Sequence, residues 1–205
     1  MKILSHRGFW QAPAEKNQLS AIAHSVNSGF GTETDVRDML GQLVVAHDPP
    51  VGDCEPWSGV VALFQDSGLP LAVNVKADGL SRMLASAFDG QAIDWFAFDM
   101  SGPETVRYAA AGLPFFTRHS DVEPSPILYD HAAGVWLDGF SGIWFDTAVI
   151  LRHLDAGKRV CIVSPELHGR KPMTLWPMLH DLPDTVLLCT DLPDKASAYF
   201  GAGRP

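Results

Sequence analysis

Two carboxylates spaced two residues apart, Glu33 and Asp35, are the side chains of this sequence best placed to do chemistry together. Residues two apart on a β-strand project from the same face, so both carboxylates can bind one hard cation. An alternating acid pair is also typical of a solvated strand face. Here Gly31, Val36 and the apolar segments nearby indicate a buried strand, where unpaired carboxylates are costly. Because oxygen ligands suit hard cations, Mg²⁺ or Ca²⁺ is favoured over zinc.

Two histidines, His6 and His47, each follow an apolar segment and can transfer protons. Cleavage of a phosphodiester needs a base that takes a proton from the nucleophile and an acid that protonates the departing alkoxide. Imidazole titrates near neutral pH and can serve in either role. A lone histidine is more often a satisfied core residue, but the nearby acids and bases favour a catalytic pair. The sequence leaves open which histidine is the acid and which is the base.

Two basic residues, Arg7 and Lys76, can donate hydrogen bonds to phosphoryl oxygens beside the acidic pair. The alternative is that they form ion pairs with Glu33 or Asp35. Both interpretations can hold, because a phosphate site often keeps its bases paired with carboxylates when no phosphate is bound. Removal of either base is therefore expected to weaken both cation and substrate binding.

The composition predicts a folded chain with a large core. Of its 205 residues 46% are hydrophobic and 19% charged, which fits one domain over residues 1–205. A net charge of −9, without a long run of Lys or Arg, argues against a nucleic-acid-binding surface. The widely spaced Cys54, Cys161 and Cys189 indicate reduced, mostly buried thiols. No segment reads as a signal peptide or a membrane span, so we expect a cytoplasmic protein.

Short apolar segments alternate with helix-compatible segments, as in a parallel α/β sheet. Strands are expected at 2–5, 30–36, 70–75, 93–98, 114–117, 133–137, 159–163 and 185–189. Helices are expected at 17–28, 78–88, 102–111, 146–156 and 173–179. Eight such units predict an α/β fold, a compact (β/α)8 TIM barrel, whose functional side chains gather at the C-terminal ends of the strands. Pro124 and Pro126 predict that the segment after the strand at 114–117 is short or a loop.

A further strand is expected at 42–46, too close behind Asp35 for a crossover helix, so its pairing must be antiparallel. This predicts a short β-hairpin extension of the second barrel strand, with a turn near 38–41. The returning strand is expected to bring His47 back to the level of Glu33 and Asp35.

Taken in order, these residues resemble the glycerophosphodiester phosphodiesterase family. The motifs are Ser5-His6-Arg7-Gly8, Asn17, Glu33-x-Asp35-Val36, Val44-Val45-x-His47-Asp48 and Lys76. The resemblance spans residues 1–76 and implies metal-dependent hydrolysis of a small glycerophosphodiester-type substrate. It also implies one divalent cation, Mg or Ca, on Glu33 and Asp35, with His6 and His47 as general acid and base. In that family the metal acidifies a substrate hydroxyl, whose attack on phosphorus gives a cyclic phosphate that water then opens.

One position departs from the family pattern, because Asn74 stands where the family has a metal-binding Glu. The implied ligands are then Glu33, Asp35 and Asn74, with an amide oxygen as the third ligand. Two alternatives stay open: a phosphate- or phosphodiester-binding protein with impaired catalysis, and a lyase that releases the cyclic phosphate. The expected partner is a small-molecule phosphodiester, with no nucleic acid and no stable membrane insertion, and the oligomeric state is left open.

Candidates beyond residue 76 are placed only by the ends of the expected strands. Segment 164–171 follows a strand and carries His168, Arg170 and Lys171, which are either a site for a second anionic group or ordinary surface residues. Further polar residues just beyond strand ends could line the pocket or pair with this loop: Arg118, Asp138 and Asp191. Three large aromatic residues are expected to pack rather than to stack on substrate: Trp10, Trp136 and Trp144.

Overall fold

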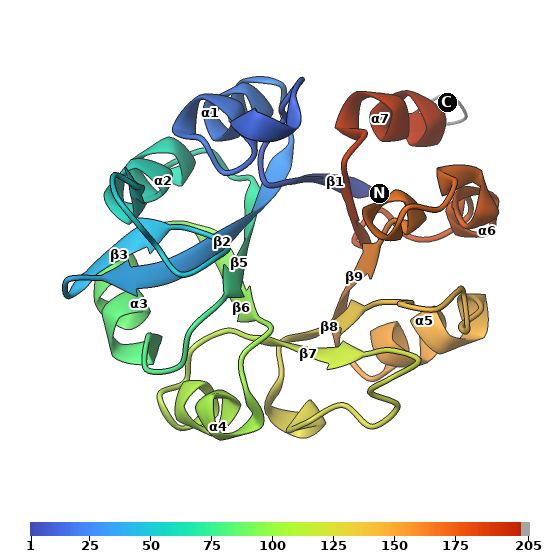
Figure 1. The fold of residues 1–205 in the computed structure, drawn as a ribbon. Helices are drawn as coiled ribbons and strands as arrows, with labels where there is room; N and C mark the ends of the chain where they lie inside the picture. The colour runs from blue at the N-terminus through green and yellow to red at the C-terminus, as the bar shows by residue number, and fades with distance from the viewer. Residues whose placement is uncertain (202–205) are drawn as a thin grey trace.

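A ring of strands with helices outside it forms the architecture of the computed structural model, which describes residues 1–201 (Figure 1). The strands are β1 (Lys2–His6), β2 (Gly31–Met39), β3 (Gln42–Val45), β4 (Glu55–Pro56), β5 (Pro70–Val75), β6 (Asp94–Phe98), β7 (Phe116–His119), β8 (Gly134–Leu137), β9 (Arg159–Val163) and β10 (Leu187–Thr190). The α-helices are α1 (Leu19–Asn27), α2 (Trp57–Phe64), α3 (Ser81–Phe88), α4 (Gly102–Ala110), α5 (Thr147–Asp155), α6 (Trp176–Leu179) and α7 (Pro193–Gly201). Short 3₁₀ helices lie at Pro13–Glu15, Tyr129–His131, Pro165–His168 and Pro172–Thr174.

Parallel pairing runs through β7, β8, β9, β10, β1, β2, β5 and β6, so each of the eight expected barrel strands is present. Strands β3 and β4 extend this sheet from β2 with antiparallel pairing. At the β6–β7 seam one isolated parallel bridge joins Ala97 to Phe115, and the Ala97 amide donates to the Pro114 carbonyl at 3.0 Å. The chain is thus an α/β protein with a mixed, mainly parallel sheet.

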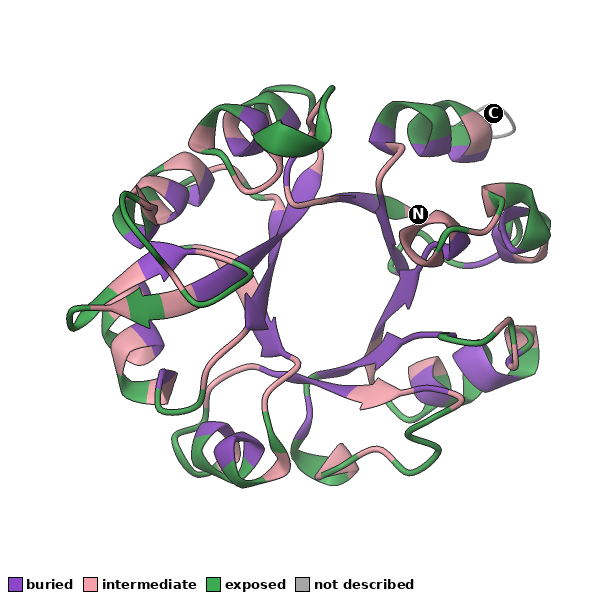
Figure 2. Ribbon diagram, in the orientation of Figure 1, coloured by how far each residue is buried: buried purple, intermediate pink, exposed green. Residues whose placement is uncertain are grey.

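Bulky side chains fill the inside of the ring of strands, where the backbone is buried (Figure 2). Phe96 stacks on Phe116 with 3.6 Å between ring centroids, and Phe98 stacks on Trp136 at 3.8 Å. These rings join β6 to β7 and β8, so aromatic packing links the strands where backbone pairing is sparse. Trp136 packs among the side chains inside the ring of strands, as predicted.

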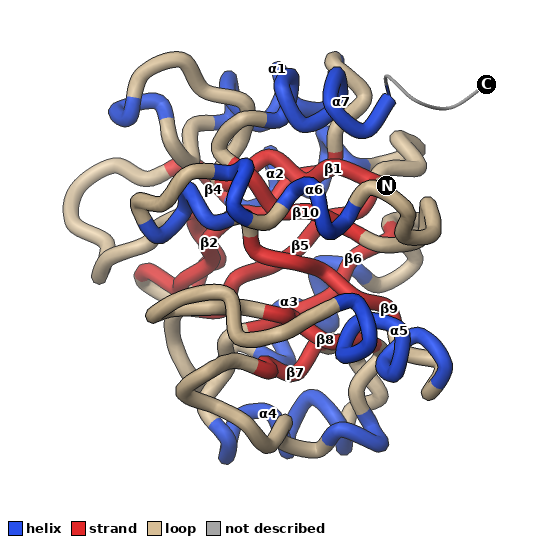
Figure 3. The backbone as a smooth tube through the Cα atoms, turned by 90° about the vertical axis from the view of Figure 1, so that its right-hand side faces the viewer, coloured by secondary structure: helices blue, strands red, loops and turns tan. Residues whose placement is uncertain are grey.

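The helices lie outside the strands and bury one face against them (Figure 3). The sequence did not predict α2, because Gly59 and its β-branched neighbours lower helix propensity. Helix α2 forms since Trp57, Val60 and Phe64 fall on one buried face. Helix α7 was also missed; Pro193 occupies its first position, where the absent amide costs nothing.

Two other boundaries differ from the expected ones. The helix expected at 173–179 is divided into a 3₁₀ turn at 172–174 and the short α6, because Pro177 restricts where the helix can begin. The strand expected at 114–117 runs from 116 to 119 instead, so Arg118 lies within β7 rather than beyond it. As expected, the connection between β7 and β8 contains no α-helix, and its one helical element is the 3₁₀ turn at 129–131.

The predicted hairpin is confirmed and carries the chain back toward the carboxylates. Strands β2 and β3 pair from Val36 with Val45 to Met39 with Gln42. The two turn residues, Leu40 and Gly41, have φ of +51° and +78°, as tight hairpins require. None of the helices within residues 1–201 has the length and hydropathy needed to cross a bilayer.

Candidate active site

The C-terminal ends of β1 and β5, and the part of β2 that pairs with them in parallel, bring the predicted site residues together. His6 on β1 lies in register with Glu33 on β2, and Asp35 on β2 lies in register with Asn74 on β5. Since the three strands are adjacent and parallel, their terminal side chains meet at one end of the sheet. Strand pairing alone therefore brings polar side chains from three separate strands into one compact cluster.

Asp35 is the centre of this cluster, and its side chain is fully buried. Its Oδ2 is 2.7 Å from Arg7 Nε and accepts a hydrogen bond from Asn17 Nδ2 at 2.8 Å. Its Oδ1 lies 3.5 Å from Lys76 Nζ. Burial lowers the pKa of Lys76, although the charges of Asp35 and Glu33 oppose that change. The ion pairs considered as an alternative for Arg7 and Lys76 are therefore present in the structure.

Glu33 is the second buried carboxylate, and it has fewer charged partners than Asp35. Its Oε1 accepts from Asn74 Nδ2 at 3.0 Å, and its Oε2 accepts from the Arg7 backbone amide at 3.2 Å. His6 Nε2 lies 3.8 Å from Oε2. Burial raises the pKa of Glu33 and the charge of Asp35 raises it further, against the opposing effects of His6, Arg7 and Asn74.

The turn after β1 has a left-handed backbone conformation that positions the Arg7 side chain. Arg7 and Asn17 have φ of +60° and +63°, in the left-handed region that non-glycine residues seldom occupy. The Asn17 amide donates to the Arg7 carbonyl at 2.9 Å, and the Asn17 side chain accepts from Thr34 Oγ1 at 2.9 Å. Gly8, at φ +91°, allows helix α1 to approach, because a Cβ there would lie 2.8 Å from the backbone of Ala21. The strain is thus concentrated beside the charged cluster.

His6 is held by a residue from the other end of the chain. Its Nδ1 donates to Asp191 Oδ1 at 2.7 Å, and Lys16 Nζ lies 3.4 Å from Asp191 Oδ2. Burial acts to raise the pKa of Asp191, but the hydrogen bond and charge of His6 together with Lys16 hold it below its usual value. The carboxylate fixes the imidazole with Nε2 directed toward Glu33. Asp191 was expected just beyond a strand end, where it could line the pocket or pair with segment 164–171; it follows β10, and its amide donates to Glu166 of that segment.

His47 lies on the far side of the cluster, where the hairpin returns. The Ala46 amide donates to the Asp35 carbonyl at 3.2 Å, which confirms the expected level of the hairpin. The His47 side chain is 45% exposed, and its Nδ1 donates to Asp48 at 2.9 Å. His47 and Arg7 line a common pocket of about 590 Å³. This exposure leaves the imidazole accessible to a bound molecule.

The oxygen atoms of the cluster fit a hard divalent cation. Two buried acceptors, Asp35 Oδ1 and Asn74 Oδ1, have no hydrogen-bond donor. In residues 1–201 no group of three or more His, Cys, Asp or Glu side chains is arranged to hold a metal ion. A cation here would therefore depend on the amide oxygen of Asn74 and on oxygens from water or substrate in addition to Glu33 and Asp35.

The charged network continues beyond Lys76 to the neighbouring strand ends. Lys76 Nζ lies 3.7 Å from Asp99 Oδ2, and Asp99 pairs with Arg118. Arg118 Nη1 donates to Asp138 Oδ2 at 3.0 Å, and His168 Nε2 donates to Asp138 Oδ1 at 2.7 Å. The structure thus brings Arg118, Asp138 and His168 together, as the sequence placed them on one face.

The other two basic residues of segment 164–171 lie apart from this network. Arg170 donates to the backbone carbonyls of Gly139 and Phe140, so it braces the loop after β8. Lys171 is exposed, and its side chain has no described partner within residues 1–201. The use of these two side chains for an anionic group stays a prediction.

Sequence reasoning missed Asp99, Lys16 and Glu166 as members of the network. Asp99 is the first residue after β6 and has φ of +67°, and its place after an apolar strand could have identified it. Glu166 accepts from Ser164 Oγ at 2.5 Å and from the Asp191 amide at 3.2 Å, which fixes the turn that carries Asp191. Lys16 carries no periodic or motif signal, because its contact with Asp191 exists only in the folded chain.

Three solved structures are similar to this chain over almost its whole length. A glycerophosphodiester phosphodiesterase from Agrobacterium tumefaciens str. C58 has a TM-score of 0.70 at 19% identity, covering 98% of this chain and 99% of that one. A calcium-dependent phosphoinositol-specific phospholipase C from a Pseudomonas species has a TM-score of 0.62 at 9% identity, covering 95% and 89%. A Ca²⁺-dependent phosphatidylinositol-specific phospholipase C from Streptomyces antibioticus has 0.59 at 10% identity, covering 97% and 95%.

No protein-family model and no curated protein sequence matches the chain. At these identities the structural matches establish the fold. The chain shares its fold with these three solved structures, so the fold implied by the resemblance of residues 1–76 is confirmed.

Proposed function

We propose that this protein is a metal-dependent phosphodiesterase that hydrolyses small diesters of the glycerophosphodiester type. The observation that carries the proposal is the convergence of two histidines, two buried carboxylates and two bases at one end of a phosphodiesterase-like fold. The proposal includes a closed (β/α)8 barrel. The Ala97–Phe115 bridge and the stacked rings across the β6–β7 seam support that closure.

The phosphate group is proposed to lie between Arg7 and Lys76, whose cationic groups both face Asp35. The phosphodiester monoanion or the developing charge of the transition state can replace Asp35 as the partner of these bases. His6 is proposed as the general base, because Asp191 stabilises the imidazolium that forms when it accepts a proton. His47 is proposed to protonate the departing alkoxide from its exposed position beside the pocket.

Glu33, Asp35 and Asn74 would hold the divalent cation, Mg²⁺ or Ca²⁺. When bound, such a cation supplies charge stabilisation and increases the acidity of a hydroxyl group near phosphorus. The Asn74 Oδ1 atom, which has no hydrogen-bond donor, supports this assignment. Asn74 now directs Nδ2 at Glu33, so rotation of its amide would turn Oδ1 toward the same space.

Hydrolysis of a panel of glycerophosphodiesters, with and without Mg²⁺ or Ca²⁺, tests the function, with products resolved by phosphorus NMR. We expect metal-dependent turnover that is lost in His6→Ala, and a monoester as the product. The control is His180→Ala, which removes an exposed histidine that hydrogen-bonds to Asp181 and packs on the edge of Tyr199. Turnover that persists in His6→Ala at the wild-type rate would refute the assignment of the base. Release of a cyclic phosphate as the final product would identify a lyase.

A second candidate is a protein that binds phosphodiesters without turnover, and one observation favours it. Asn74 leaves the cluster with two carboxylates, and Asp35 already has Arg7 and Lys76 as partners. The variant Asn74→Glu separates the two candidates. Activity in Asn74→Glu, with none in the wild type, would assign the natural protein to the binding class.

A further inference from the structure

The Glu166 side chain holds the turn between β10 and α7, which carries Asp191. Glu166 lies in the 3₁₀ turn Pro165–His168 and reaches across to the chain after β10. Its Oε1 accepts a hydrogen bond from the hydroxyl of Thr190 and another from the Asp191 amide, the second at 3.2 Å. The Leu192 amide in turn donates to Thr190 Oγ1 at 3.0 Å. One carboxylate oxygen therefore fixes three consecutive residues of the turn.

The other oxygen of Glu166 bonds to a buried serine. Oε2 accepts from Ser164 Oγ at 2.5 Å, and Ser164 Oγ accepts from Trp176 Nε1 at 2.9 Å. The Ser164 amide also donates to the Cys189 carbonyl at the end of β10, at 2.9 Å. Ser164, Trp176 and Thr190 are all buried, so bulk water does not compete for these hydrogen bonds. The carboxylate is thus held in one place while it holds the turn.

The donors around Glu166 require an acceptor on both of its side-chain oxygens. The hydroxyls of Ser164 and Thr190 each already accept one N–H, so each has its own proton left to donate to Glu166. A carboxylate accepts at both oxygens. A glutamine has one acceptor oxygen, and its NH₂ group would face one of these donors. Glu166→Gln therefore loses at least one of the three hydrogen bonds.

The position of Asp191 decides how the His6 ring is oriented. Asp191 Oδ1 accepts from His6 Nδ1 at 2.7 Å, and Asp191 Oδ2 lies 3.4 Å from Lys16 Nζ. Because the imidazole follows its partner carboxylate, a displaced turn would rotate His6 Nε2 away from Glu33. Proton transfer depends strongly on such alignment.

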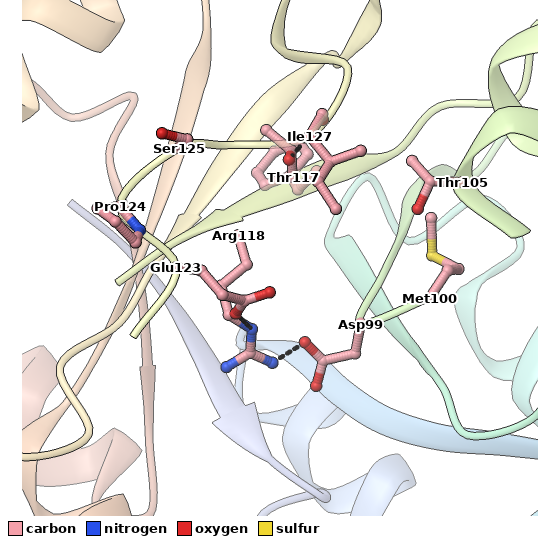
Figure 4. Close-up of a pocket in the computed structure, with 10 residues that line it drawn as sticks. Asp99, Met100, Thr105, Thr117, Arg118, Glu123, Pro124, Ser125 and Ile127 are labelled. Carbon is pink, nitrogen blue, oxygen red and sulfur yellow. Dashed lines mark hydrogen bonds and ion pairs between the residues drawn. The ribbon is translucent and has the colours of Figure 1, made fainter. Parts of the chain in front are cut away.

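The opposite end of the same 3₁₀ turn belongs to a different network. His168 donates to Asp138 at 2.7 Å, and Asp138 accepts from Arg118 at 3.0 Å. Figure 4 shows the guanidinium of Arg118 between Asp99 and Glu123, at the edge of a pocket beside the β6–β7 seam. A substitution of the glutamate in this turn should therefore perturb the chain after β10 and leave the second network in place.

We propose that Glu166 is a positioning residue for catalysis, because it holds the Asp191 carboxylate where that carboxylate orients His6. The inference rests on the proposed phosphodiesterase function for the role of His6 as the base. The orientation of the imidazole by itself does not depend on turnover. Segment 164–171 thereby gains a role in the site that does not require a second anionic group on the substrate.

Steady-state kinetics of single and double variants, with the best substrate of the glycerophosphodiester panel, test whether Glu166 acts through Asp191. Glu166→Gln should lower kcat about fivefold, the effect of one lost hydrogen bond, and leave KM within about twofold of the wild-type value. In the Asp191→Asn background the same substitution should have no further effect, because the group that it positions is gone. The control is Glu104→Gln, which alters a buried carboxylate on α4 and should keep the wild-type kcat. An unchanged kcat in Glu166→Gln, or an equal loss in both backgrounds, would overturn the proposal.

The proton on His6 Nδ1 reports the same geometry by NMR without catalysis. In protein with isotope-labelled histidine, its resonance is assigned by its loss in His6→Ala and should lie at low field, since the N–H donates to a carboxylate. The resonance should move upfield and exchange faster with water in Glu166→Gln. Thr190→Val removes one donor to Glu166 at nearly constant shape and should give a smaller change in the same direction.

An unchanged His6 resonance in both variants would refute the positioning role. A displaced resonance in Glu166→Gln, with the wild-type signal in Glu104→Gln, would support it. Absence of turnover with every diester and cation, alongside a displaced resonance, would remove the proposed function and leave the positioning of His6 by Glu166.

Discussion

A chain of hydrogen bonds through two histidines fastens the loop between β7 and β8, and we predict that acid breaks it. His119 Nδ1 lies 3.0 Å from His153 Nε2, and His153 Nδ1 lies 2.8 Å from the hydroxyl of Tyr129. The His119 ring also bonds to the backbone of Pro124. If His119 donates to that carbonyl, then His153 must donate to His119 and Tyr129 must donate to His153. Each histidine is then neutral. A proton added to His119 sets N–H against N–H, and a proton added to His153 forces the Tyr129 hydroxyl to become the acceptor.

The loss of stability in acid follows from the pKa of His153, the buried histidine of the pair. Burial is the main reason that the pKa of His153 falls from 6.5 to about 4, and the charges of His119 and Arg152 lower it further. Above pH 6.5 the folded and unfolded states are both neutral at this residue. As the pH falls toward 4 the unfolded state binds a proton that the folded state does not, so folding becomes less favourable. This group alone is expected to cost about 2 kcal/mol between pH 7 and pH 5.

Urea unfolding at pH 7 and pH 5 measures this loss in the wild type and in His153→Gln. Glutamine can bond to His119 or Tyr129 but does not titrate, so the variant should show a smaller loss of unfolding free energy between the two pH values. His180→Gln, which changes an exposed histidine, should retain the wild-type dependence. The charged groups near these hydrogen-bonded histidines remain the same in both variants; they are Arg152, Lys158 and Asp130. Equal pH dependence in His153→Gln and wild type would refute the reasoning.

Three further predictions concern the site and the hairpin. Asn74→Glu adds a buried carboxylate beside Glu33, so the variant should melt at a lower temperature than the wild type in the presence of a chelator. Addition of Mg²⁺ or Ca²⁺ should raise the melting temperature of the variant more than that of the wild type. Equal shifts in both proteins would contradict the proposed ligand set. Asp191→Asn removes the anionic partner of His6 and should lower kcat by at least about tenfold in steady-state assays, with a displaced pH–rate profile; an unchanged profile would contradict a positioning role. Leu40→Asn relieves a left-handed leucine that is 97% exposed and should raise the unfolding free energy by roughly 1 kcal/mol in urea. A loss of stability would contradict the reasoning that backbone strain dominates at this position.

The sequence determined the local order of this protein. Apolar segments alternating with helical ones identify the eight parallel strands, since the strands are short and mainly buried and most of them contain β-branched residues. The spacing of Glu33 and Asp35 fixes them on one face, and the short link to segment 42–46 allows only a hairpin. Helices α2 and α7 escaped prediction because their burial depends on the strands that they cover and not on their own propensity.

The tertiary structure alone decided which charges became partners. Asp191 reaches His6 because β10 pairs with β1, which joins residues 185 positions apart. Asp99 and Arg118 meet because β6 and β7 separate at their ends, where an ion pair takes the place of backbone pairing. A periodic pattern records only which face a residue occupies. Its neighbour on that face is set by strand order, and strand order is a property of the whole chain.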